Sequence, residues 1–407
     1  MKQLSKIMLA AVASVALAAP AFAWDFSASG SALGKFNITN TTDSTGDNTV
    51  TSGGAGSEGS SLKLASSHSD GNRSASLSYT LDWDGNLDET ITVSGSQKVG
   101  NWTASGNVSY NRDRPGCTGT VGDAVTQDNG TSGCMAQTDE DYTNVTVTNG
   151  TMTIVLGEAS HLSNQNVSTN SQAAGAVAFD PDDDDIGVGA FVDSFHGVSL
   201  GYKINDGMSA TVAYQKSSQA NDMCGAGEYI DGEATGNSGT STTGTGLGFN
   251  GTFGPAAVGV TICNASTEDV GGASVDPSSL ASTSSTMGLG VKIDLDDIKP
   301  FLSYGTYKNE GSSTKDALEY SGNEIGLTYA LGSDTVILYI GSYETTATDG
   351  GTAGNPNTYS AMEVGYNTTV GPAALKVGYG SQTRAQTGGS ADGYSMTDIE
   401  VAMSYSF

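Results

Sequence analysis

Apart from one stretch near its start, the 407-residue sequence has no long unbroken run of apolar residues, and it contains only 8 prolines. A membrane-spanning helix needs about 20 consecutive apolar residues, so none is expected in the body of the chain. No segment shows the hydrophobic period of a helix either. A spanning protein is still possible, because each strand of a β-barrel needs only about ten alternating residues.

Basic residues are also scarce. The chain carries 16 Lys+Arg against 44 Asp+Glu, and leaving out Lys2 and Lys6 near the N-terminus gives 14 − 44 = −30 for the remainder. Such a charge argues against nucleic acid and anionic lipid head groups as partners, and it favours cations or basic molecules.

The stretch near the N-terminus has a pattern of its own. Lys2 and Lys6 precede an apolar core from Ile7 to Ala19, and Ala21-Phe22-Ala23 follows. This pattern is typical of a secretory signal peptide, which we expect over residues 1–23. The exported part is then expected to begin at Trp24.

The 4 cysteines are few but informative. In an exported protein they favour disulfides over metal sites, and no spacing of Cys and His typical of zinc occurs. Cys117 and Cys134 lie in one polar segment and are expected to form a bridge within a loop. Cys224 and Cys263 would then remain to pair across two loops, although four cysteines allow three pairings in principle.

The main pattern in the sequence is a strict alternation of apolar and polar residues. At the end of the chain, Ile399, Val401 and Met403 share one face, and Asp398 and Glu400 share the other. Period two predicts strands with one apolar and one polar face. Tight turns such as Asn149-Gly150 alternate with long polar connections, the first being a Gly/Ser/Thr-rich loop over residues 39–60. This layout predicts an all-β fold, a transmembrane antiparallel β-barrel of 16–18 strands with short periplasmic turns and long extracellular loops.

The phase of the charged residues supports a barrel. If the apolar face contacts lipid, most strand charges fall in the opposite, inward phase. These residues are Lys35, Lys63, Lys98, Lys203, Lys292, Lys299, Lys376, Asp82, Glu324, Glu363 and Glu400. A soluble sandwich would need a larger apolar core.

Three stretches resemble the general diffusion porins of Gram-negative bacteria. Phe26–Ile38 resembles the opening strand of that family, and Thr146–Glu158 resembles the hairpin that leads into its constriction loop. The last residues, Ser404–Phe407, resemble the closing strand, whose terminal aromatics are part of the signal read by the barrel-assembly machinery. Tyr405 and Phe407 occupy those positions here.

The resemblance implies a pore within a barrel of residues 24–407. In that family an inward-folded loop, here around residues 159–185, narrows the pore and carries acids opposite a basic wall. The matching acids are Glu158, Asp180, Asp182, Asp183, Asp184 and Asp185. The candidates for the basic wall are Lys35, Lys63 and Lys98. Porin walls usually cluster arginines, and this chain has only four, Arg73, Arg112, Arg114 and Arg384.

The resemblance also implies a function and a location. The protein would be a homotrimeric porin in the bacterial outer membrane, surrounded by outer-membrane lipid, that passes ions and small hydrophilic solutes without a cofactor. The excess of acids favours cations over anions. The run Asp180–Asp185 is alternatively a solvated loop, and it is a candidate calcium site with oxygen ligands.

Two other functions compete with that of a porin. A structural or adhesive outer-membrane barrel without an open channel, plugged or closed, is the first. An enzyme in barrel form would need a nucleophile and a base, or a comparable acid–base pair. His68, His161 and His196 are the histidines available, and each is expected in or near a turn or irregular loop. No enzymatic activity is therefore expected.

Overall fold

The computed structural model describes most of the predicted strands and fewer of the connections. The described residues are 24–43, 45–56, 60–83, 87–112, 139–162, 195–217, 224, 240–269, 282–310, 317–349, 352–353, 357–386 and 393–407. The predicted signal peptide (1–23), Cys117, Cys134, Asp180 and Asp182 to Asp185 lie outside these ranges.

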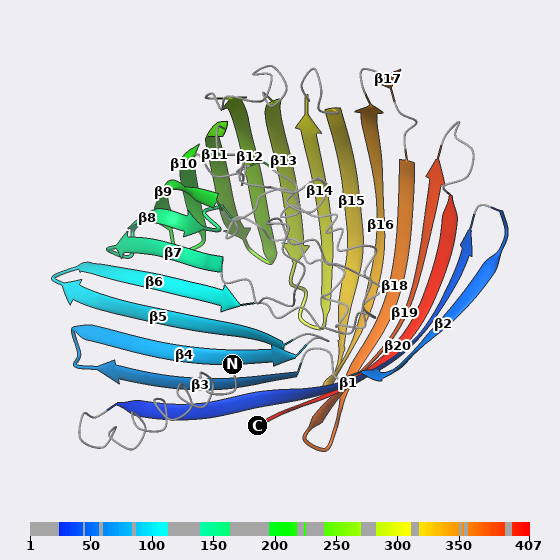
Figure 1. Cartoon of the computed structure of the whole chain (residues 1–407), viewed down its shortest axis with the longest axis horizontal. Coiled ribbons are helices and arrows are strands. Elements are labelled where there is room, and N and C mark those ends of the chain that lie inside the picture. Colours follow the sequence, from blue (N-terminus) through cyan, green and yellow to red (C-terminus); the bar gives the residue numbers. More distant parts are fainter. Residues whose placement is uncertain are drawn as a thin grey trace, which may run out of the picture. The chain divides into compact units, whose positions relative to one another are not determined.

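All the regular elements in the described ranges are β-strands, which confirms the predicted all-β class (Figure 1). They are β1 (Asp25–Asp43), β2 (Asn48–Gly56), β3 (Ser60–Ser69), β4 (Arg73–Trp83), β5 (Leu87–Val99), β6 (Trp102–Arg112), β7 (Asp139–Thr148), β8 (Met152–Ala159), β9 (Phe195–Asn205), β10 (Met208–Ser217), β11 (Thr240–Phe253), β12 (Ala256–Asp269), β13 (Ser282–Ile293), β14 (Ile298–Asn309), β15 (Ala317–Leu331), β16 (Asp334–Asp349), β17 (Thr352–Ala353), β18 (Asn357–Val370), β19 (Ala373–Gln386) and β20 (Tyr394–Ser406). Leaving out the hairpin strand β2 and the two-residue β17 gives 20 − 2 = 18 strands, the upper end of the predicted range. None of the residues placed in the structure forms a helix that is long and apolar enough to cross a membrane.

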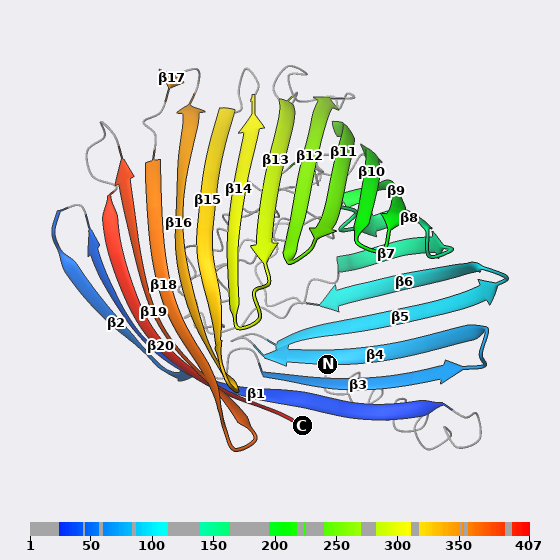
Figure 2. The same cartoon turned by 180° about the vertical axis from the view of Figure 1, so that it is seen from behind.

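The strands belong to two units. The first contains residues 24–34, 56–149 and 404–407, and the second contains residues 35–55 and 150–403, as far as these are described. In the first unit β1 pairs with β3, and the strands from β3 to β7 follow one another as antiparallel neighbours. In the second unit β8 to β16 pair in the same way, followed by β18, β19 and β20 (Figure 2). Antiparallel neighbours in chain order are the hairpin arrangement expected from the sequence.

Short and long connections alternate along the second unit, as predicted, whereas β3 to β6 of the first unit are joined by short connections only. In the second unit the short ones include 254–255, 332–333 and 371–372, whereas β8 and β9, or β10 and β11, are joined by much longer segments. Gly254, Gly332 and Gly371 have φ between 59° and 67°. Glycine reaches this left-handed region without a steric penalty, which is why tight turns form at these points.

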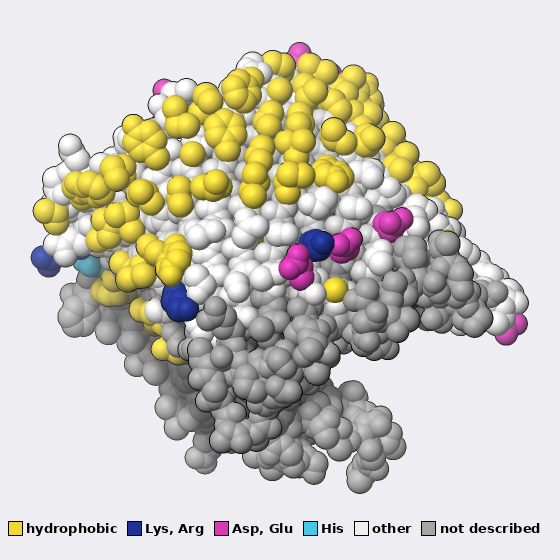
Figure 3. Space-filling model, turned by 90° about the horizontal axis from the view of Figure 1, so that it is seen from above, with side chains coloured by type: hydrophobic (Ala, Val, Ile, Leu, Met, Phe, Trp, Pro, Cys, Tyr) yellow, Lys and Arg dark blue, Asp and Glu magenta, His cyan; other side chains and the backbone are white. Residues whose placement is uncertain are grey.

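Side chains alternate between two faces of the strands. On the apolar face, large hydrophobic side chains are exposed, for example Leu247 at 56% and Ile340 at 63% (Figure 3). On the polar face, Ser303, Glu324 and Glu363 are 0%, 1% and 2% exposed. A water-soluble protein shows the reverse arrangement. A broad exposed apolar face with polar residues on the other side is the pattern of a sheet that contacts lipid.

Two local predictions were wrong. Residues 39–60 were expected to form a loop, but β1 continues to Asp43 and residues 48–56 form β2, which pairs with it. Threonine recurs in this segment and favours an extended backbone, which extends this hairpin. Cys263 was expected in a loop, but it lies within β12.

Candidate functional site

The register of the second unit aligns polar-face residues into rows across the strands. One row, the Cys263 row, consists of Ser199, Ala213, Gly246, Cys263, Thr286 and Tyr307 on β9 to β14. Another, the Glu324 row, consists of Ser303, Glu324, Gly341, Ala361 and Gln382 on β14, β15, β16, β18 and β19. Each row therefore gathers side chains from distant parts of the sequence onto one surface.

Carboxylates occupy the polar face around the Glu324 row. The hydroxyl of Ser303 donates to Glu324 Oε2 at 2.7 Å. Glu363 lies opposite Tyr339 of β16 and Gly380 of β19. Glu400 on β20 is 1% exposed. Buried carboxylates are costly unless hydrogen-bonded or paired, so this concentration of acids on one face indicates a specific role.

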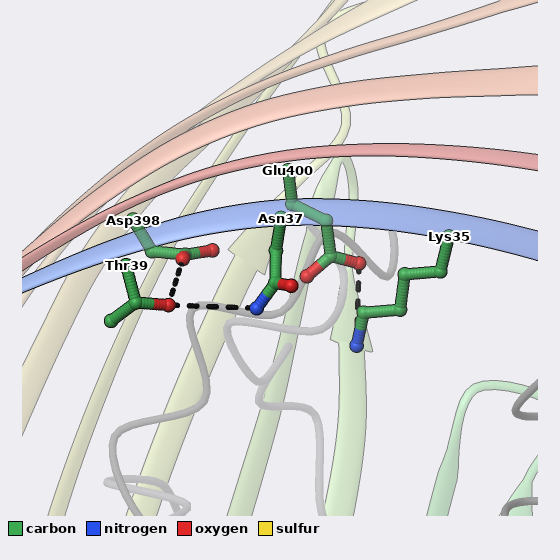
Figure 4. Close-up of polar contacts among 5 residues, drawn as sticks. All are labelled: Lys35, Asn37, Thr39, Asp398 and Glu400. Carbon is green, nitrogen blue, oxygen red and sulfur yellow. Dashed lines mark hydrogen bonds and ion pairs between the residues drawn. The ribbon is translucent and has the colours of Figure 1, made fainter. Parts of the chain in front are cut away.

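Residues of β1 and β20 meet through polar contacts (Figure 4). Lys35 Nζ lies 3.4 Å from Glu400 Oε1. The Thr39 hydroxyl donates to Asp398 Oδ1 at 2.5 Å, and Asn37 Nδ2 donates to Thr39 at 3.5 Å. Lys35, a candidate for the basic wall, is therefore paired with a neighbouring acid on the polar face.

The other two lysines of the predicted basic wall belong to the first unit. Lys63 on β3 lies opposite Ser29 and Thr80, and Lys98 on β5 lies opposite Thr103. These partners are in the polar phase of their strands, so both lysines occupy the polar face of that unit. Their role in a pore stays a prediction.

Phe407 pairs with β1 inside the first unit. The backbone N–H of Gly30 donates to the Phe407 carbonyl at 2.8 Å, and the Phe407 N–H donates back to Gly30 at 2.9 Å. The Phe407 ring lies directly over Gly30, because a Cβ added there would be 2.6 Å from the ring. Tyr405 stacks on Phe407 with 6.3 Å between ring centroids. Both aromatics of the predicted assembly signal thus take part in the structure.

The first residues after β8 are anchored to the polar face of β9. His161 Nε2 contacts the Gly157 carbonyl at 3.0 Å, and Nδ1 contacts the Ser199 hydroxyl at 2.8 Å. Because a carbonyl can only accept, Nε2 carries the proton and Nδ1 accepts from Ser199. Phe195 packs on the ring with 4.6 Å between centroids. Burial lowers the pKa of His161, so the ring is neutral at pH 7.

Because the folded state holds His161 neutral, we expect the free energy of unfolding to fall on acidification. The unfolded chain takes up a proton at His161 with a pKa of about 6.5, whereas the folded ring stays neutral to lower pH. The free energy of unfolding therefore falls as the pH drops through about 6.5, and the fall ends below the lowered folded pKa. Urea unfolding of His161→Gln should show a weaker pH dependence than the parent between about pH 7.5 and pH 5. Identical dependence in both proteins would contradict the assignment.

Glu158 lies at the strand end in an unexpected setting. Glu158 is opposite His196 on β9, two residues further along β8 than the pair Leu156 and Val198. Leu156 and Val198 are exposed on the apolar face. Glu158 Oε2 is 3.5 Å from His196 Nε2. Gly157, with φ of 113°, interrupts the regular strand geometry directly before it. The role of Glu158 as a constriction acid stays a prediction, and its observed contact is with His196.

Cys224 and Cys263 form a disulfide, as predicted for the pair left after Cys117 and Cys134. Cys263 belongs to the polar face, since its neighbour Ile262 is exposed on the other side. The two sulfurs lie in a buried cluster with Leu162, Phe195, Ala213 and Ala265. The sequence predicted the bridge, but not the apolar cluster around it, because the cluster joins residues from four separate segments.

Among the described residues, no group of three or more His, Cys, Asp or Glu side chains is arranged to hold a metal ion. The candidate calcium run Asp180–Asp185 is not among those residues.

Comparison with known proteins shows the fold. No protein-family model and no curated relative matches the sequence. The structure is similar to the anion-selective porin from Comamonas acidovorans, with 12% identity over 94% of this chain and 100% of that one, and a TM-score of 0.50. It is also similar to the outer membrane channel DcaP of Acinetobacter baumannii, with 14% identity over 94% and 97% of the chains and a TM-score of 0.52. The chain thus has the antiparallel β-barrel fold of the outer-membrane porins.

Proposed function

We propose that this protein is an outer-membrane porin that allows passive diffusion of ions and small hydrophilic solutes, with a preference for cations. The observation that carries the proposal is the inverted distribution of side chains, with an exposed apolar face and a polar face rich in carboxylates. In a barrel of this fold the apolar face contacts lipid and the polar face lines the interior. The proposed barrel comprises residues 24–407 and follows a signal peptide over residues 1–23.

The contacts of His161 support an inward course for the connection after β8. His161 bonds to Ser199, whose side chain is on the polar face, so the chain leaves β8 toward that face. We therefore propose that the residues around 159–185 form a constriction loop on the side of the polar face. Asp180 and Asp182 to Asp185 would then add acids to an interior that already contains Glu324 and Glu363.

The preference for cations rests on the residues of this chain rather than on its fold. The similar porin from Comamonas acidovorans is described as anion-selective. The fold by itself therefore does not decide whether cations or anions are preferred. Here Glu324, Glu363 and Glu400 occupy the polar face, and Lys35 is paired with one of them. Carboxylates within low-dielectric walls raise the local concentration of cations and deplete anions.

A structural or adhesive barrel without an open channel is the second candidate. One observation favours it: several polar side chains on that face of the second unit are buried, with Ser303, Gln382 and Glu400 at no more than 1% exposure. A wide water-filled pore would leave such side chains in contact with solvent. The same burial is compatible with a narrow channel, and the two candidates differ in whether solutes pass.

Swelling of proteoliposomes separates these candidates. Vesicles that contain the purified protein should swell in isotonic solutions of small neutral solutes, more slowly as the solute becomes larger, because passage through a narrow polar interior depends on size. Vesicles that contain heat-denatured protein serve as the control. A swelling rate equal to that of the control for even the smallest solutes would support the closed barrel instead.

We propose no catalytic role for the Ser199–His161 pair. Both ring nitrogens of His161 are engaged, and the group that orients the ring is the Gly157 carbonyl rather than a carboxylate. Ser199 is 4% exposed, which leaves little access for a substrate. Hydrolytic triads need an accessible nucleophile and a base held by a third group. The contact is better explained as an anchor.

The remaining partners follow from the proposed function. Outer-membrane lipid would cover the apolar face, and the barrel-assembly machinery would read Tyr405 and Phe407. A homotrimer is proposed from the porin resemblance. Calcium is proposed only at the run Asp180–Asp185, where oxygen ligands are concentrated in the sequence.

A further inference from the structure

Two separate connections are attached to the Cys263 row of the polar face. His161, which follows β8, is hydrogen-bonded to Ser199 on β9. Cys224, which follows β10, is bonded to Cys263 on β12. Ser199 and Cys263 belong to the same row and are three strands apart, a distance of about 14 Å at the usual spacing of strands. The two attachment points therefore lie at the same level of the wall.

Between Ser199 and Cys263, the polar face of the sheet (the wall) carries small residues. Ala213 and Gly246 separate Ser199 from Cys263 along the row, and Ala265 follows Cys263 on the same face of β12. Small side chains leave room for a second layer of residues on the polar face. Leu162, Phe195 and Cys224 fill that room and are 1%, 0% and 0% exposed. Their packing is that of a protein core, not of a solvated loop.

The Cys224–Cys263 disulfide fixes the position of this second layer. The Cα atoms of Cys224 and Cys263 are 5.8 Å apart, and the Cys263 side chain is on the polar face. Residue 224 must therefore lie on the interior side of the wall. We propose that Leu162, Phe195 and Cys224 form a fixed inner layer on β9–β12 that narrows the channel, and that the Cys224–Cys263 disulfide sets its width. This inference rests on the proposed function, to which it adds the residues that determine pore size.

Opening the bridge should widen the channel. Two electrons and two protons from a dithiol such as dithiothreitol convert the disulfide into two thiols, and the dithiol becomes a cyclic disulfide. Cys224 is then no longer covalently bound to Cys263, so the inner layer can move away from β12. The conductance of a narrow channel increases with its cross-section, so each open-channel step becomes larger after reduction.

The test uses the full chain with Cys117→Ser and Cys134→Ser, so that only one bridge can respond. Single-channel conductance in planar bilayers is measured before and after dithiothreitol, with thiols counted on the same sample. A larger conductance is expected once two thiols per chain appear, followed by a decrease when a cationic methanethiosulfonate reacts with them. The matched control also carries Cys224→Ser and Cys263→Ser. It should show the larger conductance from the start and no response to either reagent.

A second measurement locates Cys263 independently of conduction. The reduced protein in lipid vesicles is treated with a charged, water-soluble maleimide or with a lipophilic one. Labelling of Cys263 by the charged reagent supports an interior position, and labelling by the lipophilic reagent alone would overturn it. An unchanged conductance with two thiols present would overturn the role in pore size. If no variant conducts, the proposed function fails, and labelling by the charged reagent still supports the inner layer.

Discussion

Deletion of Phe407 is expected to abolish assembly of the protein in the outer membrane. The deletion removes both backbone hydrogen bonds between Gly30 and Phe407 and the ring that covers Gly30. A spanning sheet cannot leave backbone groups of its strands unpaired in lipid, where each costs several kcal/mol. Outer-membrane fractions should contain little of the variant, and the folded band that shifts on heating should disappear from gels. Phe407→Tyr, which keeps an aromatic ring, is the control and should assemble.

Two glycines of β1 test the same contact from the other side. An added Cβ at Gly30 would lie 2.6 Å from the Phe407 ring and 2.8 Å from the Ser61 carbonyl oxygen, whereas at Gly34 it would meet nothing within 4 Å. Gly30→Ala should therefore destabilise the barrel by about 1–3 kcal/mol, the usual cost of overpacking, and Gly34→Ala should not. Urea unfolding from lipid vesicles measures both. Equal midpoints for the two variants, or normal membrane levels without Phe407, would contradict the contact seen here.

Removal of the Cys224–Cys263 bridge is expected to give the second large effect. The bridge joins residues 39 positions apart. Closing a loop of that length in the unfolded chain corresponds to about 4 kcal/mol in the chain-entropy model. Cys224→Ser with Cys263→Ser should lower the free energy of unfolding by up to this amount, measured by urea unfolding from vesicles.

A reductant provides the internal control for the disulfide. In a background with Cys117→Ser and Cys134→Ser, dithiothreitol should lower the unfolding midpoint to that of the variant that also carries Cys224→Ser and Cys263→Ser, and it should leave that variant unchanged. Parent and variant with the same midpoint under oxidising conditions would show that the bridge does not stabilise the native state. Loss of the folded form in both would instead indicate that Cys117 and Cys134 also matter.

Strand-level features could be predicted from the sequence because period two is a local signal. The alternation at Ile399–Phe407 gives the orientation of Glu400 without any knowledge of its neighbours. The same rule gave the inward phase of Glu324 and Glu363, which the structure places on the polar face. Tight turns at glycines then account for the strand boundaries.

Contacts between distant segments could not be predicted in this way. The bond between His161 and Ser199 depends on the register of β8 and β9, which no spacing in the sequence reveals. The contact of Glu158 with His196 at the end of β8 likewise depends on this register. Gly157 has a backbone conformation that alternation does not anticipate. Pairing and register, rather than residue type, decide these positions.

The reversal potential in a KCl gradient across a planar bilayer tests the central claim most directly. Carboxylates on the polar face and in the predicted constriction loop should give open-channel currents whose reversal potential has the sign of cation preference. The preference should increase at low salt, because the Debye length grows from about 8 Å at physiological ionic strength. Glu324→Gln with Glu363→Gln, and Asp182 to Asp185 replaced by Asn, should each reduce it, and the larger reduction identifies the dominant site. Channels that prefer anions, or a membrane that shows no current steps, would contradict the account.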